Sequence, residues 1–111
     1  NVPREKLIGG VPFYTRLWTE AGDGTITSKA MGIAEEKRWV DNNQVELTWQ
    51  ADTAQYYGEV QTSDGAQFLW MEEERSLKEK MNVIRQNDLA GVACWKLGFE
   101  DSAAWDSIQW N

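Results

Sequence analysis

Two segments of this chain are almost continuously apolar, and they constrain its fold more than any other feature. Lys6 to Tyr14 (KLIGGVPFY) and residues 90–98 (AGVACWKLG) are rich in small and β-branched residues. Such runs predict strands buried on both faces, as in a parallel sheet. Pro12 falls near the end of the first strand, where a missing N–H costs least.

The second strand is preceded by a predicted helix that runs to about Gln86. Ser76 to Glu79 has the form of a capping box, in which the serine and glutamate side chains satisfy backbone N–H groups. The buried stripe is predicted to consist of four apolar residues: Leu77, Met81, Val83 and Ile84. After the second strand, Asp101 or Ser102 would cap a short helix that carries Trp105 and Trp110.

A different pattern occupies residues 20–74, beginning with a loop at residues 22–24 (GDG). A helix is predicted from Ser28, its N-cap, to Asn42–Asn43, its stop signal. Met31, Ala34 and Trp39 would form its apolar side. Residues 35–38 (EEKR) would face water.

Three strands should follow that helix as an antiparallel meander. Val45 to Gln50 alternates with a period of two, and Ala54 to Val60 and Ala66 to Met71 follow at hairpin spacing. Residues 51–53 (ADT) and 63–65 (SDG) supply the turns, with Asp-Gly the stronger tight-turn signal. We expect Trp39, Trp49 and Trp70 to serve as the core of this unit rather than as a binding surface.

Composition excludes several classes of function. A net charge of −7 argues against a nucleic-acid binder and gives no basic patch for a membrane. The absence of histidine removes Ser-His-Asp and Cys-His catalysis and all histidine-based metal sites. Cys94 is the only cysteine, so no internal disulfide forms, and a buried, inert thiol is expected. No cofactor or metal is expected.

The order of elements gives the fold class. If residues 20–74 are removed, a β–α–β crossover with two parallel strands remains. Two parallel strands cannot bury both faces by themselves. We therefore predict an α+β chain in which an antiparallel meander and helix are inserted into a segment of a larger parallel sheet or barrel.

Several motifs in this order resemble the C-terminal part of glycoside hydrolase family 18, the chitinase-like (β/α)8 barrels. The residues that carry the likeness are KLIGGVPFYTRLW and RSLKEKMNVIRQNDLAGVACWKLGFED. PFYTRLW and the run QYYGEV…DGAQFLWMEEERSLKEK are closest to the bacterial branch that acts in spore germination and cortex lysis.

The resemblance implies a division into three parts. Residues 1–19 would be barrel strand seven, Lys6 to Tyr14, and its exit loop, and residues 20–74 the chitinase insertion domain. Residues 75–111 would supply helix seven (Ser76 to Gln86), strand eight (Val92 to Leu97) and part of helix eight. The parent protein would then be extracellular, cell-wall or spore-associated.

The resemblance also implies a sugar site. Trp95 matches the tryptophan at the end of strand eight on which the reacting N-acetyl sugar stacks, at the barrel end where active sites form. Tyr14, Arg16 and Trp18 would face the same cleft, and Glu100 and Asp101 are candidates for its mouth. Glu72 to Glu74 is expected to be a solvated charge run.

The family's catalytic signature, Asp-x-x-Asp-x-Asp-x-Glu, supplies the general acid, while the substrate's N-acetyl group acts as nucleophile. No two aspartates in the chain are spaced three apart, and the run is absent. We therefore expect no hydrolysis by the chain itself and assign it no catalytic residue.

Two functions stay open. The chain is either part of a glycosidase for an N-acetylglucosamine polymer, chitin or cortex peptidoglycan, or a stand-alone carbohydrate-binding or interaction module. Strands apolar on both faces favour the first. They would also be exposed in the isolated chain, so we expect dimers or strand exchange through Lys6–Tyr14 or Val92–Leu97.

Overall fold

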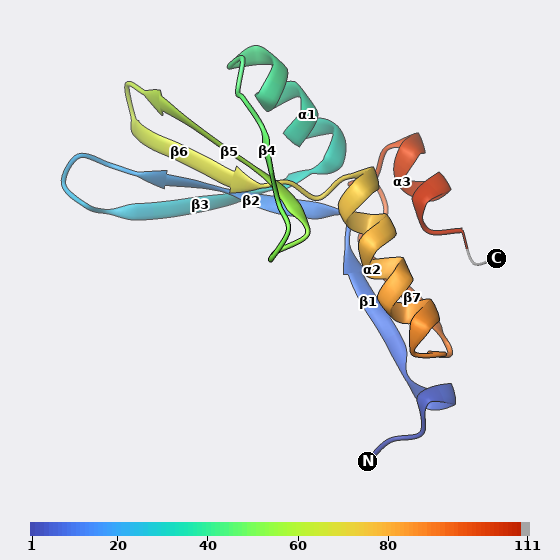
Figure 1. The fold of residues 1–111 in the computed structure, drawn as a ribbon. Helices are drawn as coiled ribbons and strands as arrows, with labels where there is room; N and C mark the ends of the chain where they lie inside the picture. Colours follow the sequence, from blue (N-terminus) through green and yellow to red (C-terminus); the bar gives the residue numbers. More distant parts are fainter. Residues whose placement is uncertain (110–111) are drawn as a thin grey trace.

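The computed structural model describes residues 1–109, which form two sheets. The smaller sheet pairs β1 (Ile8–Pro12) with β7 (Gly91–Trp95) in parallel. Helix α2 (Glu74–Gln86) runs alongside it, with α3 (Ser102–Ser107) beside α2 (Figure 1). The parallel pairing predicted from the two apolar segments is thus confirmed.

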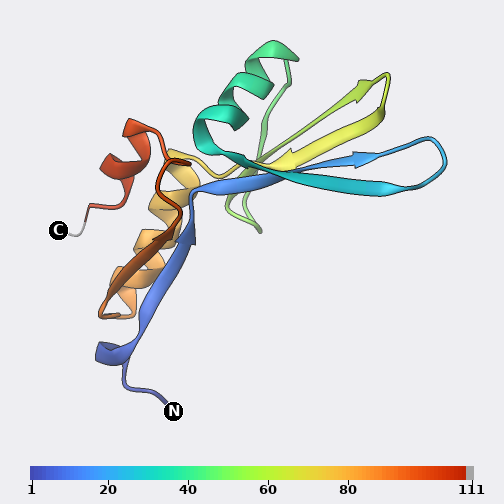
Figure 2. The same cartoon turned by 180° about the vertical axis from the view of Figure 1, so that it is seen from behind.

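The larger sheet is antiparallel, in the order β3-β2-β6-β5-β4. Its strands are β2 (Tyr14–Glu20), β3 (Ile26–Gly32), β4 (Thr48–Gln50), β5 (Gln55–Thr62) and β6 (Gly65–Trp70). Helix α1 (Ile33–Asn42) lies over one face, and the sheet projects away from the β1–β7 pair (Figure 2). The predicted α+β class and meander are confirmed, and Gly65 reaches the positive φ of +127° that its tight turn requires.

The hairpin of β2 and β3 was not predicted. Residues 15–19, expected as an exit loop, lie within β2, and residues 28–32, expected to begin a helix, lie within β3. Helix α1 therefore begins at Ile33 after Gly32, and Ser28 accepts a hydrogen bond from Arg16 instead of capping a helix. Strand pairing across the whole length of β2 outweighs the local helical pattern. Asn43 ends α1 as predicted.

Two hydrophobic cores hold the sheets. The first lies between the β1–β7 pair and α2, and Ile33 at the start of α1 reaches into it. Its buried members are Val11, Phe13, Ile33, Leu77, Met81, Ile84 and Ala104. The second lies between the larger sheet and α1, and its buried members are Leu17, Met31, Leu69 and Met71.

Burial corrects several sequence expectations. Ile8 and Trp95 in the two apolar strands are 63% and 67% exposed, since this sheet has just two strands in residues 1–109. Val83, placed in the stripe of α2, is exposed. Cys94 is half-buried, and this burial raises the pKa of its thiol.

The start of helix α2 differs from the predicted capping box. Glu73 is the N-cap, and its carboxylate accepts hydrogen bonds from the backbone N–H groups of Arg75 and Ser76. Ser76 returns a bond from the third helical position by accepting the N–H of Glu73. The predicted partner, Glu79, is exposed. Asp101 caps α3 as predicted, by accepting the N–H of Ala104, whereas Trp110 lies outside the described residues.

Candidate functional site

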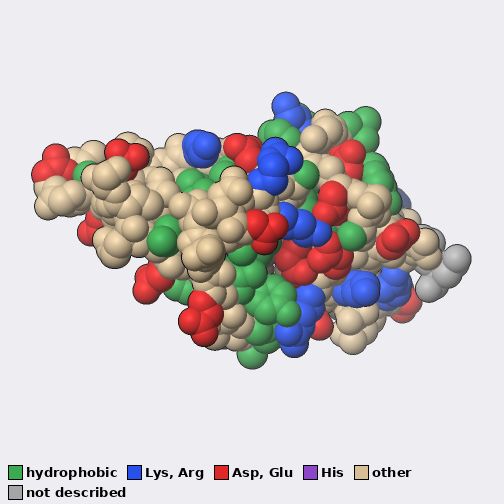
Figure 3. Space-filling model, turned by 90° about the horizontal axis from the view of Figure 1, so that it is seen from above, with side chains coloured by type: hydrophobic (Ala, Val, Ile, Leu, Met, Phe, Trp, Pro, Cys, Tyr) green, Lys and Arg blue, Asp and Glu red, His purple; other side chains and the backbone are tan. Residues whose placement is uncertain are grey.

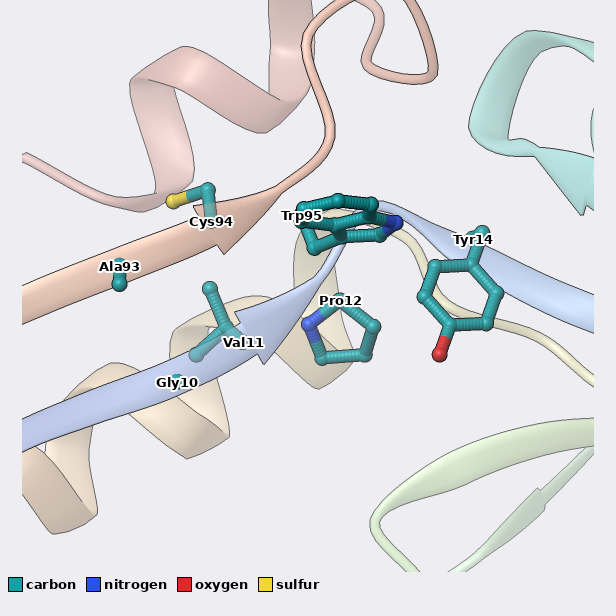
Figure 4. Close-up of a pocket in the computed structure, with 7 residues that line it drawn as sticks. All are labelled: Gly10, Val11, Pro12, Tyr14, Ala93, Cys94 and Trp95. Carbon is teal, nitrogen blue, oxygen red and sulfur yellow. The ribbon is translucent and has the colours of Figure 1, made fainter.

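A hollow of about 420 Å³ opens where β1 and β7 end. Its lining residues come from the two parallel strands and the first residue of β2: Gly10, Val11, Pro12, Tyr14, Ala93, Cys94 and Trp95. The rings of Trp95, Pro12 and Tyr14 gather around its end (Figure 4). Carboxyl ends of parallel strands are the usual location of active sites in barrels.

Trp95 is the most exposed aromatic residue of this hollow, at 67% of its surface. Its backbone carbonyl accepts a hydrogen bond of 2.6 Å from the N–H of Phe13, which fixes its strand to the turn between β1 and β2. The peptide bond from Trp95 to Lys96 is cis. A large exposed ring on an anchored backbone is suited to stacking against a flat apolar surface.

Tyr14, Arg16 and Trp18 share one face of β2, because successive side chains of a strand alternate. Leu17, on the opposite face, lies in the core under α1. Arg16 donates from Nε to the Ser28 hydroxyl at 2.9 Å, which holds its guanidinium along β3. Of these three, only Tyr14 lines the hollow beside Trp95. Arg16 and Trp18 extend the same surface away from it.

The segment after Trp95 ties the hollow to the larger sheet. The carbonyl of Phe99 accepts the N–H of Ile33 at 2.6 Å. A Cβ on Gly32 would lie 2.9 Å from the backbone of Phe99, so only glycine allows this approach. Glu100, a candidate for the mouth of the cleft, instead accepts the N–H of Gly98 and closes the turn.

Buried glutamates are the main feature that sequence reasoning missed. Glu36, expected to face water, is fully buried, and Glu72 and Glu73 of the expected solvated run are buried too. Burial raises the pKa of Glu36 to about 10, so its carboxyl is protonated at neutral pH. Burial also raises the pKa of the nearby Glu72, although the ammonium group of Lys80, 2.6 Å from its Oε1, opposes that effect.

A raised pKa is typical of a general acid, but these carboxyls are engaged by neighbouring groups away from the hollow beside Trp95. Glu36 accepts the N–H of Glu72 at 2.8 Å, inside the junction between α1 and the segment that enters α2. Glu72 is held by Lys80 and Gln55, and Glu73 caps α2. None of the three lines the hollow beside Trp95. Their role is therefore structural.

Lys37 joins the same junction from the outside. It forms ion pairs with Glu74 and Asp101, and so connects α1 to the starts of α2 and α3. Burial by itself lowers the pKa of Lys37, but the two carboxylates outweigh it, and the pKa is raised. On the face that Figure 3 shows, most basic side chains lie next to acidic ones.

Within residues 1–109, no cluster of three aspartate, glutamate or cysteine side chains is arranged to hold a metal ion. No helix in that range is long and apolar enough to cross a membrane.

Comparisons with known proteins identify the family. Residues 1–100 match the sequence model of Glycosyl hydrolases family 18, and the chain belongs to this family. The cortical fragment-lytic enzyme of Bacillus subtilis is 24% identical over 107 residues, covering 95% of this chain and 25% of that protein. The chain thus spans about a quarter of the length of this curated relative.

Solved structures share the fold across nearly the whole chain. A chitinase from Chromobacterium violaceum superposes with a TM-score of 0.86 at 22% identity, over 96% of this chain and 33% of that one. A class V chitinase from Nicotiana tobaccum, an E115Q mutant in complex with NAG4, gives 0.76 at 16% identity, over 96% and 34%. These likenesses confirm the fold class that the resemblance implied.

Proposed function

We propose that this chain forms the floor and one wall of a glycan cleft in a family 18 glycosidase. The observation that carries the proposal is Trp95, whose exposed indole stands at the carboxyl end of a parallel strand beside a hollow of about 420 Å³. A flat indole suits the apolar face of a pyranose ring. Tyr14 lines the same hollow, and Arg16 and Trp18 continue the wall along β2.

The ligand that we propose is a polymer containing N-acetylglucosamine, either chitin or the peptidoglycan of the spore cortex. The family match supports a glycan, and the names of the similar proteins span both polymers. The NAG4 complex of the tobacco chitinase supports N-acetylglucosamine as the repeating unit. Cell-wall or spore association would follow from such a substrate.

We place the general acid outside this chain. The Asp-x-x-Asp-x-Asp-x-Glu run is absent from its 111 residues, and the carboxyls with raised pKa values at the junction are buried and bonded to their neighbours. The three-part division at residues 19 and 74 is part of the same proposal, with β2 continuing from the barrel strand into the insertion domain.

The test is titration of the chain with N-acetylglucosamine oligomers and muropeptides, followed by tryptophan fluorescence. A saturable change should disappear in Trp95→Ala and persist in Trp105→Phe, the matched control at an exposed tryptophan of α3. No saturable change at millimolar sugar, or an unaltered response in Trp95→Ala, would contradict the proposal. Release of reducing sugar by the chain alone would contradict the placement of the acid.

The incomplete parallel sheet supports a piece of a larger barrel over a stand-alone module. Ile8 on β1 is 63% exposed, and Leu97, two residues beyond the end of β7, is 78% exposed. Exposed apolar edges of this kind promote association, so the isolated chain should dimerise or exchange strands. Light scattering should show a mass that grows with concentration, and that growth should weaken in Ile8→Lys. A constant monomer mass would count against this expectation.

A further inference from the structure

Glu36 lies buried at the junction between the two parts of the chain. The backbone passes between the two sheets twice, at Phe13 and at residues 71–73. On α1, Ile33 lies one turn before Glu36 and is buried in the first core, whereas Trp39 lies about one turn after it and packs against the second core. Separation of the two parts at this point would therefore expose the Glu36 carboxyl to water.

The hydrogen bonding of Glu36 suits an uncharged acid. Its Oε1 accepts the N–H of Glu72 at 2.8 Å, and its Oε2 has no partner among residues 1–109. An ionised carboxylate at this position would keep one hydrogen bond in place of the several that water provides, and buried groups of this kind give up their charge instead. The closed junction therefore holds a protonated acid, in agreement with the pKa of about 10 that burial produces.

The charged groups around Glu36 do not compensate for ionisation. Glu72 and Glu73 face it from the segment that enters α2, and their negative charges oppose a further one. Lys37, on the same helix, faces it as a cation but already neutralises other carboxylates. The ion pairs one step further out are those of Lys37 with Glu74 and Asp101, and of Lys80 with Glu72.

Opening of the junction is therefore linked to a proton. In water a glutamate ionises near its ordinary pKa of 4.5, so the closed junction binds a proton at neutral pH that the open one releases to solvent. Rising pH then favours opening, by up to about tenfold in the equilibrium constant for each pH unit. An acidic medium stabilises the closed arrangement.

The first turn of α1 is also bonded to the wall of the Trp95 hollow. The N–H of Ile33, three residues before Glu36, donates to the carbonyl of Phe99 at 2.6 Å. The ring centroids of Phe99 and Tyr14 are 6.2 Å apart, and Tyr14 lines the hollow beside Trp95. Movement of α1 away from the segment that enters α2 would therefore disturb one side of this hollow.

We propose that Glu36 is a proton-dependent switch between the two parts of the chain, which keeps the junction closed and the wall of the Trp95 hollow in place while it is protonated. Loss of the proton opens the junction. Where it concerns sugar the inference rests on the proposed function, since a sugar in the hollow would favour the closed junction. It gives a buried residue outside the hollow a part in regulating binding.

The test is backbone hydrogen exchange followed by NMR between about pH 5 and pH 8, with protection factors corrected for intrinsic exchange. The N–H groups of Glu72 and Ile33, bonded across the junction, are the reporters, and amides of β6, the middle strand of the larger sheet, report unfolding of the whole chain. Protection of the reporters should be lower than that of β6. It should also fall with rising pH, by up to about tenfold per unit.

Two variants assign the pH dependence. Glu36→Gln keeps an acceptor for the N–H of Glu72 but cannot ionise, so protection of the reporters should fall less steeply with pH. Glu35→Gln is the matched control, since it removes the neighbouring carboxylate, whose side chain is 45% exposed, and it should keep the wild-type slope.

Sugar tests the link to the hollow. N-acetylglucosamine oligomers at ten times their dissociation constant should raise protection at Glu72 and Ile33 about tenfold, because they bind the closed junction and not the open one. Tryptophan fluorescence in the same samples, compared with Trp95→Ala, reports binding independently.

The outcomes separate this switch from the proposed function. Reporters as protected as β6 at every pH, or equal slopes in the wild type and Glu36→Gln, would overturn the switch. Sugar that binds at Trp95 without raising protection would overturn the link to the hollow and leave the sugar site standing. Absence of sugar binding would overturn the proposed function, while the pH slopes of the reporters still decide whether Glu36 controls the junction.

Discussion

The carboxyl of Glu36 accepts a hydrogen bond of 2.8 Å from the backbone N–H of Glu72. This bond joins α1 of the larger sheet to the segment that leads into α2, and both side chains are out of contact with water. The second oxygen of Glu36 has no partner among residues 1–109. The junction between the two parts of the chain is therefore built around a neutral carboxylic acid.

The first prediction concerns pH. Folded Glu36 keeps its proton up to a pKa of about 10, whereas the ordinary pKa of a glutamate in the unfolded chain is 4.5. Between these values unfolding releases a proton, so the free energy of unfolding should fall with rising pH, by up to about 1.4 kcal/mol per pH unit. The contribution is fully present below the unfolded pKa. Burial also raises the pKa values of the neighbouring carboxyls of Glu72 and Glu73, which makes the free energy of unfolding fall with rising pH in the same way.

Urea unfolding of the wild type and Glu36→Gln between about pH 5 and pH 8 measures this effect. The glutamine keeps an acceptor for the N–H of Glu72 but cannot ionise in this range. Its stability should therefore decline less steeply with pH. Parallel curves for the two proteins would show that Glu36 does not carry the dependence.

The second prediction concerns the pair of Lys80 and Glu72, whose closest atoms are 2.6 Å apart. Lys80→Met should destabilise the chain by about 2 kcal/mol, because it leaves a buried carboxylate without its cation. Glu72→Gln in the same chain should restore part of that loss. A double-mutant cycle of unfolding free energies measures the coupling, and purely additive losses would refute the pairing.

The third prediction separates the observed helix cap from the one that the sequence pattern favoured. Glu73→Ala removes the acceptor for the first N–H groups of α2 and should cost about 1 kcal/mol. Glu79→Ala is the matched control, since Glu79 is exposed, and it should change stability by less than about 0.5 kcal/mol. The reverse order of effects in thermal unfolding would favour the box at residues 76–79.

The fourth prediction concerns Gly32. A methyl group there would meet the backbone of Phe99 at 2.9 Å, so Gly32→Ala should destabilise the chain by roughly 1–3 kcal/mol. Gly91→Ala, in open space on β7, should be neutral or slightly stabilising. Unfolding midpoints compare the two variants. Equal midpoints would mean that the backbone at Phe99 moves away from the added methyl group without loss of stability.

The aromatic residues show where sequence reasoning reached its limit. The family resemblance implied that Trp95 and Tyr14 face one cleft, and both line the hollow at the ends of β1 and β7. Trp18 was expected at the cleft and Trp70 in the core of the inserted unit, yet both lie on one face of the larger sheet, where Phe68 is paired with Trp18 and contacts Trp70. Their relation depends on the register between strands distant in sequence.

By itself the sequence determined the local elements: the two apolar strands, the meander with its Asp-Gly turn, and the stop of α1 at Asn43. These follow from periodicity and turn chemistry within a few residues. The tertiary structure alone decided that β3 replaces the start of a helix, and that Glu36, Glu72 and Glu73 are buried. The physical reason is that pairing between distant strands, and contact of α1 with the segment that leads into α2, decide whether a charged side chain is buried. A local sequence pattern contains no information about either.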